Sequence, residues 1–238
     1  MRLRSKLSPI VILTILFALG LIFTNAFTSV TQSQPQESPE KSEDKKLVEA
    51  IRRGGYREAA KLKGHYVGTA DPNWDWANFN LEELTKASAA VVVGVPQTSI
   101  VQLSSTGDQI TTNYKVKVEN VIKGNLAASN IVEVSLLGGR VEFDDGTSAE
   151  IRTPDFERMQ NGKRYILFLY ANRNGSEIFL LTGGPQGLFE LVSDGKVKPH
   201  ARPTNHVAKE IEYKSIDSLL GELRMYAERW PKSSGCCN

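Results

Sequence analysis

The chain has 238 residues, of which 40% are hydrophobic and 24% are charged, a composition typical of a globular protein with its own core. Its 29 Lys and Arg residues nearly balance its 27 Asp and Glu residues. Residues 1–26 hold three of the basic residues and none of the acidic ones, which leaves 26 basic against 27 acidic residues in the remainder. This near-neutral balance argues against nucleic acid as a partner.

The amino terminus has the pattern of an export signal. Arg2, Arg4 and Lys6 precede an apolar run from Ile10 to Phe23, and a basic segment followed by an apolar segment of this length is typical of a secretory leader. The basic flank is expected to stay in the cytoplasm. We therefore expect everything after about Ala26 to be exported and extracytoplasmic.

Two fates of this leader, residues 1–30, fit the sequence. Thr24-Asn25-Ala26 is an acceptable cleavage site, and cleavage after Ala26 would give a secreted or periplasmic protein. The uncharged stretch Ile10–Val30 has 21 residues, and at about 1.5 Å of rise per residue it is also long enough to remain as a transmembrane helix that anchors the protein. Both fates stay open.

Composition divides the rest of the chain into five segments: a disordered linker at 31–46, a helical and irregular lead-in at 47–88, a β-barrel at 89–200, a loop and helix at 201–230, and a flexible tail at 231–238. In the lead-in, Gly54-Gly55 interrupts the first helical pattern and makes it a helical hairpin, and Asn80 is a candidate N-cap for a short second helix. The tail contains Cys236 and Cys237, which either form an intermolecular disulfide or have no role.

From Ala89 onward the hydrophobic pattern changes to a period of two. Tyr114 to Glu119 alternates apolar and charged residues, and further short segments of this kind follow up to Val192, separated by turns such as Asp144-Asp145-Gly146. Ile216 to Trp230 then has its apolar residues on one helical face. We expect a mainly β (α+β) fold, an antiparallel OB-like barrel or sandwich, flanked by the N-terminal helical hairpin and by a C-terminal amphipathic helix covering one barrel end.

Three of these segments, Ala89 to Val95, Tyr114 to Gly124 and Gly162 to Leu169, resemble the core of netrin-type modules and of tissue inhibitors of metalloproteinases. The likeness covers about residues 85–192 and consists of the hydrophobic pattern and a Lys-Gly turn. It implies a five-stranded OB-type barrel flanked by helices. Those inhibitors chelate the protease zinc through an N-terminal cysteine, and the barrel segment here has no cysteine, so their mechanism carries over to no residue of this chain.

Two groups of residues are candidates for a functional site. Trp74, Trp76 and Phe79 lie in a polar segment, where they either pack onto the barrel or form an exposed platform for a sugar ring or a partner protein. His200 and His206 lie six residues apart beside prolines, which excludes a helical i, i+4 metal pair. They either converge on a metal with an acidic residue, Asp194 or Glu210, or are solvated loop histidines whose replacement leaves stability unchanged.

The sequence contains no Gly-x-Ser-x-Gly, His-Glu-x-x-His or Walker phosphate-loop motif. We therefore expect a non-catalytic module without a cofactor, displayed outside the membrane and binding a protein or an envelope polymer. The alternative is a secreted hydrolase or metal-dependent enzyme that uses His200 and His206.

Overall fold

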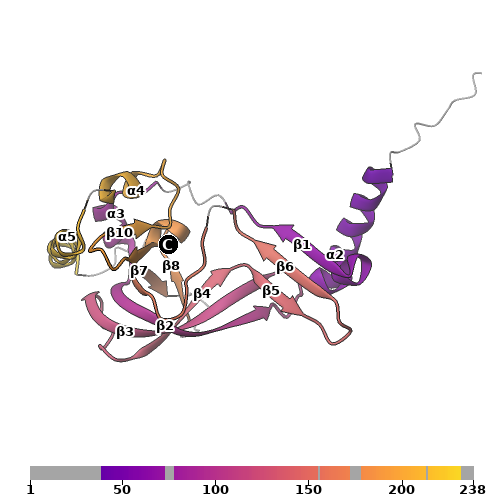
Figure 1. Cartoon of the computed structure of the whole chain (residues 1–238), viewed down its shortest axis with the longest axis horizontal. Coiled ribbons are helices and arrows are strands. Elements are labelled where there is room, and N and C mark those ends of the chain that lie inside the picture. The colour runs from indigo at the N-terminus through magenta and orange to yellow at the C-terminus, as the bar shows by residue number, and fades with distance from the viewer. Residues whose placement is uncertain (1–38, 73–77, 155, 172–177, 213, 232–238) are drawn as a thin grey trace, which may run out of the picture. The chain divides into compact units, whose positions relative to one another are not determined.

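The computed structural model describes residues 39–72, 78–154, 156–171, 178–212 and 214–231 (Figure 1). The leader at 1–30 and the pair Cys236 and Cys237 lie outside the described residues. The chain forms two units, residues 1–44 and 45–238, and the barrel belongs to the second. Within the described ranges, no helix is both long enough and apolar enough to cross a membrane.

Five strands form a closed ring: β2 (Ala90–Leu103), β3 (Ile110–Lys123), β4 (Ile131–Leu137), β8 (Ile178–Leu181) and β7 (Arg164–Ala171). Each strand pairs with the next in this order, and β7 pairs back with β2, so the predicted barrel is confirmed. One pair, β4 with β8, is parallel, which corrects the expectation of a wholly antiparallel barrel. After β4 the chain leaves the ring and returns to it as β7, which runs antiparallel to β2. Strand β8 in turn runs antiparallel to β7, so it has the direction of β2 and of β4 and pairs with β4 in parallel.

Side chains that alternate along these strands fill the barrel. Tyr114, Val116 and Val118 of β3 are buried, whereas Lys115 and Lys117 between them are exposed. The inward residues of β2, β4 and β7 join them in one apolar cluster that includes Val92, Val134, Leu167 and Leu169. The period of two in the sequence is therefore the inside–outside alternation of the barrel wall.

Three helices cover the outer face of one side of the barrel: α3 (Leu81–Ala87), α4 (His206–Ile211) and α5 (Ile216–Arg229). They pack on the outward residues of β2 and β7, such as Val91 and Phe168, and on β9 (Leu188–Leu191), which extends the sheet next to β7. Strands β2 and β7 are therefore buried on both faces, which explains their continuous apolar runs. The C-terminal helix covers this side of the barrel, not one end as expected.

Local signals placed the two capped helices correctly. Asn80 accepts a hydrogen bond from the backbone N–H of Glu83 at 2.8 Å, and the Glu83 carboxylate accepts the backbone N–H of Asn80 at 3.0 Å, a complete capping box on α3. The Ser215 side chain accepts the N–H of Ser218 at the start of α5. Each cap joins residues three positions apart and is therefore a local feature of the sequence.

The predicted Lys-Gly turn ties β3 to α3. Lys123 is buried, and its ammonium donates hydrogen bonds to the backbone oxygens of Thr85 at 2.7 Å and Lys86 at 3.2 Å, in the last turn of α3. Gly124 follows with φ +96°, and a Cβ there would lie 2.8 Å from the Ala89 oxygen. The turn therefore combines a long cationic side chain, which reaches the backbone oxygens of α3, with a glycine, because a Cβ at this position would clash with the backbone.

A second, smaller sheet has the order β1 (His65–Thr69), β6 (Ser148–Arg152), β5 (Gly139–Glu142) (Figure 1). Strands β5 and β6 form the predicted hairpin around Asp144-Asp145-Gly146. Strand β1 corrects the irregular conformation expected after the first helix, because its partner β6 lies about eighty residues away in the sequence and leaves no local signal.

Helix α2 (Pro39–Lys63) precedes this sheet and is broken at Gly54-Gly55, as predicted. It begins at Pro39, inside the segment expected to be a disordered linker, and proline is well suited to the first turn of a helix because no intrahelical N–H is needed there. Beyond the break, the Tyr56 N–H donates to the oxygen of Gly107, at the tip of the β2–β3 hairpin, at 2.7 Å.

Candidate functional site

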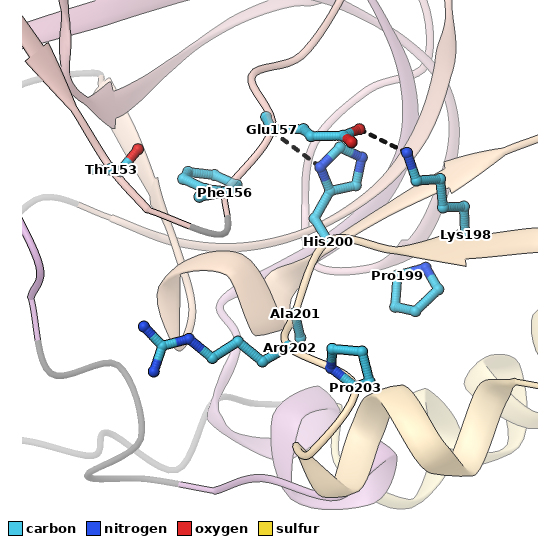
Figure 2. A pocket seen from close by; sticks show the side chains of 9 residues that line it. All are labelled: Thr153, Phe156, Glu157, Lys198, Pro199, His200, Ala201, Arg202 and Pro203. Atoms are coloured by element: carbon cyan, nitrogen blue, oxygen red, sulfur yellow. Dashed lines mark hydrogen bonds and ion pairs between the residues drawn. The ribbon is translucent and has the colours of Figure 1, made fainter.

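An open pocket of about 510 Å³ lies beside His200. It is bounded by the segment that follows β6 and by the end of β10 (Val197–Pro199), the edge strand next to β9, and its lining consists of Thr153, Phe156, Glu157, Lys198, Pro199, His200, Ala201, Arg202 and Pro203 (Figure 2). Its charged groups are already engaged, because Lys198 pairs with Glu157 at 2.6 Å and Arg202 pairs with Asp71 at 3.4 Å.

The imidazole of His200 is sealed into the protein, with only 1% of the side chain exposed. Its Nδ1 lies 3.0 Å from the backbone oxygen of Glu157 (Figure 2). Because a carbonyl oxygen only accepts, Nδ1 carries the proton and Nε2 of the neutral ring carries the lone pair. Burial, the largest effect, lowers the pKa of His200 below its usual 6.5, so the ring is neutral at pH 7.

The other nitrogen of this ring faces a buried carboxylate. His200 Nε2 lies 3.9 Å from Glu190 Oε2 and has no hydrogen-bond partner among the described residues. Glu190 is held by Lys163 at 2.7 Å through its other oxygen, and the rings of Phe156 and Tyr165 pack against the imidazole. Since Nε2 is buried, His200 cannot contact a molecule in the pocket through this atom. Its hydrogen bond to the Glu157 oxygen joins the segment that follows β6 to the end of β10.

The expectation of solvated loop histidines is therefore wrong for His200. His206 is exposed, but it begins α4, and its backbone N–H donates to the Asn78 side chain at 3.0 Å. The proposed acidic partners are engaged elsewhere, Glu210 by the Leu81 N–H at 2.8 Å and Asp194 by Lys196 at 3.4 Å. In the part of the chain that the structure describes, no three His, Cys, Asp or Glu side chains gather closely enough to hold a metal.

Of the three candidate aromatic residues, Phe79 packs onto the protein. Its side chain is partly buried against the cluster beneath α3, α4 and α5, and its backbone N–H donates to Gln186 Oε1 at 3.1 Å. Gln186 lies in η3 (Gly184–Gly187), the tight turn that leads into β9. Trp74 and Trp76 lie outside the described residues, so their contact with a partner stays a prediction.

A second hollow, which we call the barrel groove, has a volume of about 230 Å³. It lies near the start of η3, and its lining consists of Pro72, Gln109, Thr111, Ser135, Leu136, Leu137, Phe156, Tyr170, Leu180, Leu181 and Gly184. Leu136, Leu181 and Phe156 belong to the apolar cluster inside the barrel, whereas the other lining residues of the strands lie on its outer face. None of these residues carries a charge. The barrel groove is thus a neutral surface on a protein in which about a quarter of the residues are charged.

Strand register assembles the floor of this groove. Ser135 of β4 lies opposite Leu180 of β8, and Leu180 lies opposite Tyr170 of β7, so the three side chains form one row on the outer face. Thr111 of β3 lies opposite Leu137 in the adjacent row. Tyr170 remains 40% exposed. Sequence reasoning missed the groove because its floor combines two pairs of strands, β3 with β4 and β7 with β8, which β5 and β6 separate in the chain.

No family model matches the chain, and no curated protein is significantly similar to it in sequence. We therefore infer its function from the two hollows.

Proposed function

We propose that the protein is a non-catalytic binding module, exported and either anchored by its leader or released, and that its partner binds in the barrel groove. The observation that carries this proposal is the composition of the groove, where apolar and aromatic side chains surround a few uncharged polar groups. Such a mixture is typical of binding sites, in which apolar contact supplies affinity and a few polar groups orient the ligand.

The construction of the groove supports the same proposal. Strand β4 is paired on both sides, with β3 and with β8, and β8 is paired with β4 and with β7. A floor built from strands in a closed ring keeps its shape before a partner arrives, so binding costs little conformational entropy. A preformed, rigid surface is what a displayed binding module requires.

The pocket beside His200 is less suited to chemistry on a ligand. The lone pair on Nε2, the group that a general base would use, is buried and faces Glu190. The charges of Glu157 and Lys198 neutralise each other in an ion pair. We retain Trp74 and Trp76 as predicted partner contacts, because Pro72, two residues before Trp74 in the chain, lines the barrel groove.

The test compares two bulky substitutions on the outer wall of the barrel. Ser135→Trp fills the groove, whereas Thr98→Trp places the same side chain at an exposed position of β2 that does not line it. We expect Ser135→Trp to abolish complementation of a deletion strain with an unchanged melting temperature, and Thr98→Trp to complement normally. Normal complementation by a folded Ser135→Trp protein would refute the proposal. Failure of a folded His206→Ala variant would favour the enzyme alternative instead.

A further inference from the structure

The barrel groove selects against charged ligands. The charged residues of the same outer wall, Lys115, Lys117 and Glu133, are absent from its lining, and Glu133 already accepts a hydrogen bond from the Asn113 side chain at 2.9 Å. A charged group entering the groove would lose hydration without meeting an opposite charge. Its occupant is therefore neutral.

The occupant is also polar. Gln109, Thr111 and Ser135 line the groove, and among the described residues their side chains make no hydrogen bond to one another or to the rest of the protein. A hydroxyl both donates and accepts, and so does a carboxamide. A purely apolar ligand would bury these groups unpaired, at a cost of about 1–3 kcal/mol each. A ligand rich in hydroxyl groups would pair with all three.

Leu180 and Tyr170, which lie in the same row as Ser135, add an apolar and aromatic surface next to the polar groups. Tyr170 is 40% exposed and contributes aromatic area to the groove at low cost in side-chain entropy, and the C–H face of a sugar ring is flat and apolar while its rim carries hydroxyls. A peptide strand fits less well, because β4 and β8 have neighbours on both sides and offer no free edge for strand addition.

We propose that the barrel groove binds a short section of a neutral, polyhydroxylated polymer, that is, a glycan chain of the cell envelope. This inference rests on the proposed binding function and specifies its ligand. The volume of about 230 Å³ lies below the roughly 300–1,000 Å³ of small-molecule sites, so the groove holds only a small part of its ligand, as it would for a longer chain that continues beyond it.

The experiment measures sedimentation of the full chain with the envelope fraction of the cells that produce it, after detergent has removed the lipid from this fraction so that the leader has no membrane to enter. One portion of the fraction is untreated, one is oxidised with periodate, which cleaves the vicinal diols of glycans, and one is digested with protease and washed. We expect binding to the untreated and the protease-treated portions and loss of binding after periodate. Thr111→Val combined with Ser135→Ala removes two hydroxyls and should weaken binding about tenfold or more, whereas Thr98→Val should not.

Each other outcome overturns a defined part of the account. Binding that survives periodate but not protease would show a protein partner, which refutes the glycan inference and leaves the binding module intact. Equal binding by the double variant and by the wild type would show that the groove is not the glycan site. Absence of binding to the untreated fraction would refute both the inference and the proposed function.

Discussion

Replacing Lys123 with Met should destabilise the protein by about 2 kcal/mol. The ammonium of Lys123 is buried and donates to the oxygens of Thr85 and Lys86, in the last turn of α3, at 2.7 Å and 3.2 Å. Methionine keeps most of the apolar side-chain volume and removes the charge. The substitution therefore isolates what the cation contributes to the contact between β3 and α3.

Two opposing effects set this magnitude. Hydrogen bonds to a charged group contribute about 1.5–3 kcal/mol each, so the two bonds together contribute about 3–6 kcal/mol. Against this, burial lowers the pKa of Lys123, which means that the folded protein disfavours its charged form relative to the unfolded chain. The cost of burying the charge offsets part of the contribution of the two bonds, so we expect a net loss of stability of about 2 kcal/mol on substitution. For a domain of this size this loss corresponds to a fall in melting temperature of about 4–8 °C.

Urea denaturation at pH 7, followed by far-ultraviolet circular dichroism, measures this difference. Lys117→Met on the same strand is the matched control, because Lys117 is exposed, and it should change stability by less than about 0.5 kcal/mol. A Lys123→Met protein as stable as the wild type, or more stable, would refute the reasoning, since it would show that removing the buried charge fully compensates for the two lost bonds.

Two further predictions concern the helices and His200. Leu219→Ala removes a fully buried side chain from the contact of α5 with the barrel wall, so the free energy of unfolding in urea should fall by about 3 kcal/mol. Leu220→Ala changes a partly buried side chain and should lower it clearly less. Equal losses would contradict the observed orientation of the helix. Between pH 7 and pH 5 the melting temperature should fall, because the pKa of His200 is lowered in the folded state and the unfolded chain, with a pKa near 6.5, binds the proton first. The contribution of the neutral His200 side chain to stability is complete above pH 6.5 and is lost as the pH falls toward the pKa of His200 in the folded protein. A His200→Gln variant whose melting temperature has the same pH dependence would contradict this assignment.

Local patterns were sufficient for much of the fold. Alternation from Tyr114 to Glu119 identified a barrel strand, Asp144-Asp145-Gly146 identified a hairpin, and Asn80 identified the start of α3, because each signal lies within a few residues. The first part of β2 has no such alternation, because Ala90, Val91, Val92 and Val93 are all buried and a strand covered on both faces needs no polar side chain.

Signals that depend on distant partners were missed. Strand β1 is short and half exposed, and only its pairing with β6 makes it a strand. His200 follows a proline and looks like a loop residue, yet Phe156 and Tyr165, some 35–45 positions earlier, bury it. The barrel groove depends on the register between strands, and no stretch of sequence contains more than a small part of it.

Photo-crosslinking in living cells tests the barrel groove most directly. A benzophenone-bearing amino acid is introduced in place of Tyr170, which lines the groove, and separately in place of Arg202, which lines the pocket beside His200. On irradiation we predict a crosslinked adduct of increased mass from position 170 and none from position 202. An adduct from position 202 with none from position 170 would contradict the account and move the binding site to the pocket beside His200.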